Sequence, residues 1–280
     1  MNVSFKHHDI EFPTQNDVLL RGWLYEPIRE VENQNLYPGI VMSPYYGSVK
    51  ELFLDLYAEY ITKFNFVVLL YDNQNFGDSE VDPERIGIWG TSYSGGHVLV
   101  VSAIDKRINC VVSQMPSING KQNLRRKHKN DEAYQKLLNA FERDRKQIAE
   151  GGTPRMIPIL QPALQPDWWE FFDVNKALDE DKWRYKNWKN EQTLRSLEMY
   201  GEYNPEEYIE QVSPCPLLMI VAENDTVTFT EDEIELFEKK VREPKKLVKF
   251  NGDHFLAYKG QPFEITAKAA SEWFTKYLQT

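Results

Sequence analysis

Short apolar runs of strand length, alternating with segments of helical pattern, are the feature that most restricts the fold of this 280-residue chain. Continuous apolar runs are typical of strands buried on both faces, because a half-exposed strand alternates apolar and polar residues. The alternation predicts an α/β fold with a mostly parallel sheet covered on both faces. The expected strands are Ser4–Phe12, Val18–Tyr25, Gly39–Ser43, Phe66–Tyr71, Ile86–Trp89, Cys110–Gln114, Pro216–Ala222 and Lys246–Phe250, and the expected helices of this part are Lys50–Phe64, Glu231–Val241 and Pro262–Leu278.

A region of different character separates the two sheet-forming parts. Residues 117–214 are charged and aromatic in patches, and their expected helices, Asp131–Gly151 and Asn190–Tyr200, are separated by several prolines. We therefore expect a core made of residues 1–116 and 215–280, with a helical insertion at residues 117–214. Helices inserted into an α/β sheet suggest a cap over the functional site. The alternative is a lateral decoration without a role in binding.

Composition excludes several classes of protein. The 33 Lys and Arg residues against 43 Asp and Glu give a net charge of −10 at pH 7, which disfavours binding to nucleic acid and to anionic membranes. The two cysteines, Cys110 and Cys215, lie in apolar runs and are expected to be buried free thiols of a reducing compartment. We see no targeting segment and no apolar run near the ~20 residues that span a bilayer. The sequence therefore predicts a soluble cytoplasmic protein.

The most informative stretch runs from Ile86 to His97. An apolar strand enters Gly90-Thr91-Ser92-Tyr93-Ser94, and an apolar helix follows. This strand–turn–helix context is that of a nucleophile elbow, in which a strained turn exposes a nucleophile and needs small residues two positions before and after it. Gly90 and Ser94 meet that need, with Ser94 in place of the usual glycine. Ser92 is therefore the candidate nucleophile.

A serine hydroxyl needs a base, and in this kind of site the chain order is Ser, acid, His. His254 follows the last expected strand, whereas His128 lies in a solvated basic run. The acid is expected after the preceding strand, which makes Asp225 the leading candidate. Glu223 is the first alternative, and Asp253 is a weaker one because adjacent residues on an extended loop point apart.

Two backbone donors are needed to stabilise the oxyanion of an acyl-transfer reaction. One is expected from Tyr93, directly after the nucleophile, and the other from Tyr46 in the loop after the strand Gly39–Ser43. Tyr45 is the second candidate for this backbone donor and is also a candidate pocket residue. The aromatic cluster of the insertion adds further pocket candidates, namely Trp168, Trp169 and Phe172. No metal site and no cofactor are expected, and His97 is expected to be structural.

These motifs together resemble the α/β hydrolases of the dienelactone-hydrolase-like or acyl-peptidase-like group, which includes fungal polyketide transferases and thiohydrolases. The resemblance covers nearly the whole chain. It implies the α/β-hydrolase fold with a Ser–Asp–His acyl hydrolase or transferase under a helical cap, but it does not identify the acyl group. The matching segments are Arg21–Tyr25, Val49–Phe53, Tyr71–Ser79, Gly87–His97, Glu191–Tyr200, Leu217–Asp225 and Gly252–Tyr258.

The chain departs from this group at two places. Pro44-Tyr45 stands where the group usually has His-Gly, so the oxyanion loop is altered. The segment Asp72–Arg85 is shorter than the helical crossover of the group, and its Gly, Asn, Asp and Pro content argues against a helix. A crossover between parallel strands usually takes a dozen or more residues and is helical. We therefore expect a shortened form with exposed apolar surface there, which a partner chain such as a second copy covers or which leaves the protein poorly stable.

The resulting hypothesis is a serine acyl hydrolase or acyltransferase that acts on a small-molecule ester or thioester with an apolar acyl chain. Secondary (polyketide) metabolism is a candidate setting, and an alcohol is a candidate acyl acceptor. The alternatives are an acyl-peptidase-like serine peptidase, a non-catalytic binding protein on the same fold and a membrane-surface lipase.

Overall fold

The structure, a computed structural model, describes residues 4–13, 19–28, 36–72, 81–128, 130–160 and 179–279, except for the side chains of residues 81–83. The described chain separates into two compact units, 1–116 with 207–280 and 117–206. The second unit begins where the sequence predicts the helical insertion and ends before residue 214. Its role as a cap stays a prediction.

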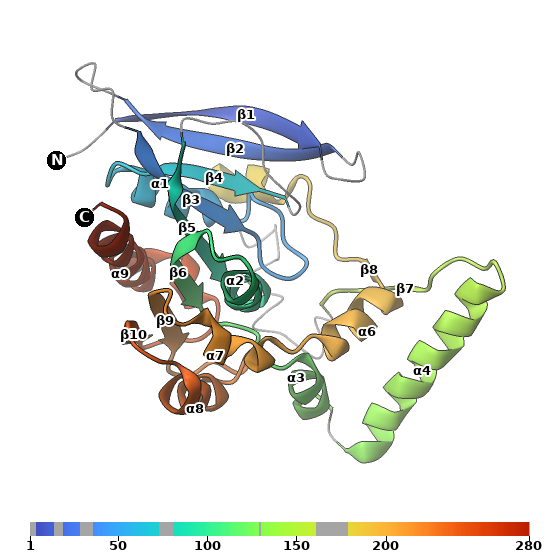
Figure 1. Ribbon diagram of the computed structural model, residues 1–280. Coiled ribbons are helices and arrows are strands. Elements are labelled where there is room, and N and C mark those ends of the chain that lie inside the picture. The colour runs from blue at the N-terminus through green and yellow to red at the C-terminus, as the bar shows by residue number, and fades with distance from the viewer. Residues whose placement is uncertain are drawn as a thin grey trace. The chain divides into compact units, whose positions relative to one another are not determined.

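The larger unit is built on an eight-stranded sheet with the order β1-β2-β4-β3-β5-β6-β9-β10 (Figure 1). The pairings from β4 through β10 are parallel, and β1 and β2 join antiparallel at one edge. The predicted α/β class and mostly parallel sheet are therefore confirmed. The strands of this sheet are β1 (Phe5–Pro13), β2 (Leu19–Pro27), β3 (Tyr37–Ser43), β4 (Val67–Tyr71), β5 (Val81–Thr91), β6 (Ile108–Gln114), β9 (Leu217–Ala222) and β10 (Lys245–Phe250).

The helices of the larger unit cover this sheet on both faces. The chain passes from β3 to β4 in one direction along the sheet and from β5 to β6 in the other. Because such crossovers are right-handed, the helices on these two connections lie on opposite faces, and α1 packs with α9 while α2 packs with α7. The helical elements are α1 (Leu54–Thr62), α2 (Tyr93–Ile104), α7 (Ile209–Val212), α8 (Thr230–Lys240), η3 (Leu256–Tyr258) and α9 (Gly260–Leu278).

The smaller unit is mainly helical in its described part. Helix α3 packs on α6, and α4 also packs on α6. The ring hydroxyl of Tyr200 on α6 lies 3.0 Å from the Ser117 hydroxyl, and it accepts a 3.0 Å hydrogen bond from the Asn123 amide of α3. The elements are α3 (Gly120–Arg126), α4 (Asp131–Ala149), β7 (Met156–Ile157), η1 (Asp179–Tyr185), β8 (Gln192–Thr193), α6 (Leu194–Glu202) and η2 (Pro205–Glu207).

The elbow strand is longer than the sequence predicts. Strand β5 begins at Val81 and not at Ile86, because Val81 already pairs with Tyr37 of β3 ahead of a register shift. The connection from β4 is therefore residues 72–80, of which 73–80 lie outside the described residues.

The expectation of exposed apolar surface beside this connection can be checked on the described residues of β4. On β4, Val67 and Leu69 are buried in a cluster with apolar residues of β1 and β2, so the expectation is wrong there. On α2, Val101 is 43% exposed and Ile104 is 65% exposed. These two exposed side chains belong to the helix that follows the elbow, and they do not test the expectation for the connection between β4 and β5.

Candidate active site

The candidate nucleophile occupies a strained turn between β5 and α2. Ser92 has φ 58° and ψ −117°, a backbone conformation that non-glycine residues rarely adopt. Such strain is typical of functional turns that the surrounding structure holds in place. Gly90 makes the turn possible, because a Cβ atom there would lie 2.1 Å from the backbone oxygen of Ser94. The small residue that the elbow pattern requires at this position is therefore a steric necessity.

Ser94, which replaces the last glycine of the usual elbow pattern, is buried and cross-links the turn. Its hydroxyl accepts a 2.9 Å hydrogen bond from the Thr91 N–H. The same hydroxyl lies 2.9 Å from the Ser43 carbonyl oxygen and 3.0 Å from the Thr91 carbonyl oxygen, and its single hydrogen is shared between these two acceptors. The serine therefore joins the elbow to the end of β3, which a glycine could not do.

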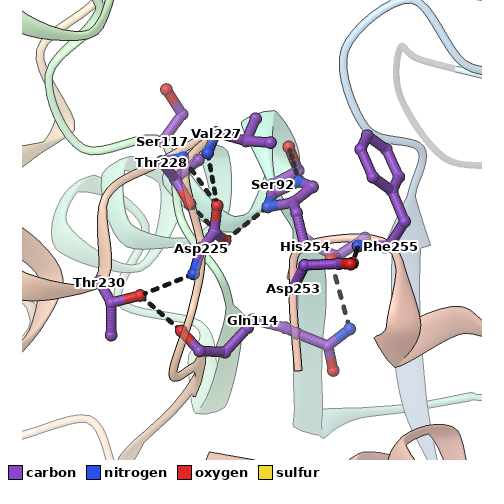
Figure 2. Close-up of polar contacts among 12 residues, drawn as sticks. Ser92, Gln114, Ser117, Asp225, Val227, Thr228, Thr230, Asp253, His254 and Phe255 are labelled. Atoms are coloured by element: carbon purple, nitrogen blue, oxygen red, sulfur yellow. Dashed lines mark hydrogen bonds and ion pairs between the residues drawn. The ribbon is translucent and has the colours of Figure 1, made fainter. Parts of the chain in front are cut away.

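Three predicted residues meet at the carboxyl ends of the strands (Figure 2). The Ser92 Oγ lies 2.9 Å from His254 Nε2, and His254 Nδ1 lies 2.6 Å from Asp225 Oδ2. A carboxylate only accepts, so His254 Nδ1 carries the hydrogen and Nε2 is left to accept from the serine hydroxyl. All three residues are buried. This arrangement has the geometry of a nucleophile, a general base and an orienting acid.

The Asp225 carboxylate is held by a turn of its own chain. Its Oδ1 accepts from the N–H groups of Val227 at 2.7 Å and Thr228 at 3.1 Å, and its Oδ2 accepts from the Thr228 hydroxyl at 2.9 Å. Burial alone raises the pKa of a carboxyl, but the charge and hydrogen bond of His254 and these N–H groups outweigh it and lower the pKa of Asp225. The carboxylate is therefore ionised at neutral pH.

The alternative acids and base lie elsewhere. Glu223 is exposed, and the Asp253 carboxylate accepts from the N–H groups of Phe255 and Leu256 within its own turn. His128 belongs to the smaller unit, where its Nδ1 lies 2.6 Å from the Leu124 carbonyl oxygen. None of the three enters the Ser92–His254–Asp225 arrangement as the structure describes it.

The two residues expected to supply oxyanion donors are neighbours. Tyr93 is the first residue of α2, where backbone N–H groups point out of the helix. The ring of Tyr46 packs edge-to-face on the ring of Tyr93 with 5.2 Å between the centroids. Tyr45 is turned into the interior, where its hydroxyl donates to the Leu52 carbonyl oxygen at 3.3 Å. The roles of these residues in catalysis stay predictions.

His97 supports the first turn of α2. Its Nδ1 lies 3.0 Å from the Tyr93 carbonyl oxygen, which can only accept, and the two rings pack edge-to-face at 4.5 Å. Burial lowers the pKa of His97 to about 4, so the imidazole is neutral at neutral pH. Both contacts lie within the helix that starts at the nucleophile.

The remaining predicted pocket residues, Trp168, Trp169 and Phe172, lie outside the described residues. Across the described ranges, no group of three or more His, Cys, Asp or Glu side chains is arranged to hold a metal ion. In the same ranges, no helix combines the length and the apolar character needed to cross a membrane.

Two residues that interact with Asp225 were not predicted from the sequence. Thr228 donates to Asp225 from three positions further along the chain, a spacing typical of turns closed by Asp, Ser or Thr side chains. That spacing is the feature of the sequence from which Thr228 could have been predicted. Glu233 of α8 is fully buried, and the charge of Asp225 affects its carboxyl. The residues next to Glu233 in the sequence are acidic, which is typical of an exposed helix face. The sequence therefore does not indicate that Glu233 is buried.

The fold is that of the α/β hydrolases. A crystal structure of the α/β hydrolase GrgF from Penicillium sp. sh18 matches with a TM-score of 0.78 and 22% identity, over 98% of this chain and all of that one. The sequence profile of the acetyl xylan esterase family matches residues 66–152, which include the elbow.

The curated relatives fall in the group that the motifs resemble. A thiohydrolase of Eupenicillium brefeldianum is 26% identical over 93% of this chain and 91% of its own length. A polyketide transferase of Penicillium sp. is 25% identical over 85% of this chain and 86% of its own. The predicted resemblance to the thiohydrolase and polyketide transferase group of α/β hydrolases is therefore confirmed. These names support an enzyme of the hydrolase kind.

Proposed function

We propose that the protein is a serine acyl hydrolase or acyltransferase, with Ser92 as nucleophile, His254 as base and Asp225 as orienting acid. The single observation that carries the proposal is the continuous pair of hydrogen bonds from Ser92 Oγ to His254 Nε2 and from His254 Nδ1 to Asp225 Oδ2. The strained elbow at Ser92 adds a second, independent reason to assign it a chemical role.

In the proposed reaction, Ser92 Oγ attacks the carbonyl carbon of an ester or thioester while His254 Nε2 takes the hydroxyl proton. Asp225 stabilises the imidazolium that forms, and it stays ionised throughout. Collapse of the tetrahedral intermediate breaks the bond to the leaving alcohol or thiol, which receives the proton from His254. Water or an acceptor alcohol then attacks the acyl-enzyme and gives its proton to His254. The bond between the acyl carbon and Ser92 Oγ breaks, His254 returns the proton to Ser92 Oγ, and the acid or the new ester is released.

The developing oxyanion is assigned to the backbone N–H groups of Tyr93 and Tyr46. The edge-to-face contact of the two rings brings the altered loop after β3 beside the residue that follows the nucleophile. Each donor of this kind is typically worth about 3 kcal/mol of transition-state stabilisation. Pro44, which replaces the usual histidine of the loop, has no N–H and supplies no donor.

An apolar acyl group is the proposed substrate feature. The half-buried rings of Tyr46 and Tyr93 flank the elbow, and an aromatic surface favours an apolar chain. The relatives named as thiohydrolase and polyketide transferase support a thioester or ester carbonyl. Together these observations favour a small-molecule acyl donor over a peptide.

Turnover of a panel of acyl esters and acyl thioesters of graded chain length, with and without an added alcohol, tests this proposal. We expect release of alcohol or thiol by the wild type, with a preference for apolar chains. New ester in the presence of alcohol identifies a transferase, and free acid identifies a hydrolase. Ser92→Ala is expected to lower turnover by at least about 10³-fold, since loss of a nucleophile removes most of the catalysis.

Ser102→Ala is the matched control. Ser102 lies on the same helix as the elbow, is buried, and its hydroxyl bonds only to helix carbonyl oxygens of Val98 and Leu99 among the described contacts. This variant should turn over the panel at the wild-type rate. Turnover by Ser92→Ala equal to that of Ser102→Ala would contradict the proposal.

A further inference from the structure

A buried polar network lies beneath the nucleophile and takes no direct part in the chemistry. The Thr91 hydroxyl lies 3.0 Å from the Tyr258 hydroxyl and accepts from the Gln114 amide nitrogen at 3.3 Å. The same amide nitrogen donates to the Tyr57 hydroxyl at 3.2 Å. All four side chains are 0% exposed. Polar groups removed from water to this extent cost free energy unless their hydrogen bonds are made, so the network has to hold its geometry.

The network joins the chain segments that carry the nucleophile and the base. Thr91 directly precedes Ser92, and Tyr258 follows His254 by four residues. Gln114 is tied to the elbow a second time, because its backbone oxygen accepts from the Ser92 N–H at 2.8 Å. From the other side, the Tyr57 hydroxyl donates to the Ala257 carbonyl oxygen at 2.6 Å.

Strand pairing does not set the distance between nucleophile and base. Ser92 follows β5 and His254 follows β10, and strands β6 and β9 lie between these two in the sheet. Neighbouring strands are about 4.8 Å apart, so three spacings separate the two strand ends by roughly 14 Å. The loop after β10 therefore has to return across the sheet before His254 reaches Ser92. The hydroxyl pair of Thr91 and Tyr258 is a direct bond between the returning loop and the elbow.

We infer that Tyr258 is a positioning residue for the proposed reaction: its hydroxyl, bonded to Thr91, holds the His254 loop at the distance from Ser92 that proton transfer requires. The inference rests on the proposed function. The described bond of Tyr258 is to Thr91, the residue before the nucleophile, so Tyr258 is assigned a role through the loop and not in the chemistry itself. Gln114 acts in the same way, because one N–H of its side-chain amide donates to Thr91 in the elbow and the other donates to Tyr57 of α1.

The test removes the bond one hydroxyl at a time. Tyr258→Phe and Thr91→Val are each expected to lower kcat for p-nitrophenyl butyrate, and the rate of inactivation by a fluorophosphonate, by about tenfold, the scale of one buried hydrogen bond. KM should stay the same, since the loss is in proton transfer and not in binding. The double variant should lose no more than Thr91→Val alone, because the bond that Tyr258→Phe removes is already absent in Thr91→Val. Thr91→Ser keeps the hydroxyl and should keep the wild-type rate.

Tyr60→Phe is the matched control, since Tyr60 also lies on a core helix but its ring packs on Phe64 and Phe263, outside the network. It should leave kcat and the inactivation rate unchanged. A wild type that the fluorophosphonate labels at Ser92, with Tyr258→Phe and Thr91→Val labelled at the same rate, overturns the positioning role alone. The same conclusion follows if these variants only lower Tm while kcat of the folded protein is unchanged. A wild type that is not labelled overturns the proposed function and this inference together.

Discussion

At the scale of single residues, two buried carboxyl groups near the site have pKa values shifted in opposite directions. Asp225 is buried but ionised, because His254 and backbone N–H groups lower its pKa. Burial raises the pKa of Glu233 well above its usual range, and the negative charge of Asp225 raises it further. Two carboxyl groups in one buried region thus avoid mutual repulsion, since one of them keeps its proton.

This difference gives a stability prediction for Glu233→Gln. The unfolded chain ionises Glu233 above about pH 4.3 while the folded chain keeps the proton, so the folded state binds more protons and stability falls as pH rises through that range. A neutral glutamine removes this loss. We expect Glu233→Gln to raise Tm at pH 7 relative to the wild type, by roughly 2–4 °C for each kcal/mol gained, and the gain to disappear as the pH is lowered toward 4.

Thermal unfolding monitored by circular dichroism between pH 4 and pH 8 checks this prediction. The control is Glu238→Gln, an exposed residue of the same helix, which should give the wild-type curve at every pH. A Glu233→Gln variant whose Tm difference from the wild type is the same at pH 4 and pH 7 would contradict the account of Glu233.

The residues of the candidate triad could be located from the sequence, whereas the residues that hold them could not. Ser92 and Asp225 each follow a continuous apolar run, and His254 follows the last expected strand, so chain order alone placed them at one edge of a parallel sheet. The Thr91–Tyr258 bond joins residues 167 positions apart. No local periodicity of the sequence indicates such a contact, because Thr91 and Tyr258 are each of a residue type that is common in its own segment.

At the scale of elements, most strands and helices were predictable because each carries its own apolar pattern. The exceptions lie where tertiary pairing overrides that pattern. Val81 reads as part of a loop, but its backbone pairs with Tyr37 and extends β5. The expected helix at Lys50–Phe64 begins only at Leu54, because Phe53 has a left-handed backbone with φ 65°. Ahead of it, the Lys50 N–H and ammonium group both bond to the carboxylate of Asp72, which directly follows β4. Lys50 and Asp72 are 22 residues apart in the sequence, so no local pattern indicates their contact.

The exposed apolar residues of α2 predict a measurable tendency to associate. Ile104 is 65% exposed and Val101 is 43% exposed on the helix that follows the elbow. Exposed apolar surface favours association, whereas surface substitutions usually change stability by less than about 0.5 kcal/mol. We expect Ile104→Glu to reduce concentration-dependent association in sedimentation velocity experiments, with Tm close to that of the wild type.

The control for this surface is Ile265→Glu, which introduces the same charge at a 41% exposed isoleucine of α9. It should leave the association of the protein unchanged. A wild type that sediments as a single species at all concentrations would contradict the prediction, and equal effects of the two substitutions would show that α2 is not the surface responsible.

At the scale of the whole molecule, the sheet order explains why the candidate site forms where it does. The chain leaves β3 toward β4 and leaves β5 toward β6, so the direction of winding reverses between β3 and β5. Binding sites in open α/β sheets lie at the carboxyl ends of the strands at such a reversal. Ser92 follows β5, and the loop with Tyr46 follows β3. The loops after β9 and β10 add Asp225 and His254 at the same edge.

Covalent labelling of the intact protein by a fluorophosphonate, located by mass spectrometry of its peptides, tests the central claim most directly. The account predicts one phosphonyl group on Ser92 in the wild type, no label in Ser92→Ala, full label in Ser102→Ala and a rate at least about 10²-fold lower in His254→Gln, since the serine then lacks its base. Absence of label on Ser92 in folded wild-type protein, or label that persists unchanged in Ser92→Ala, would contradict it.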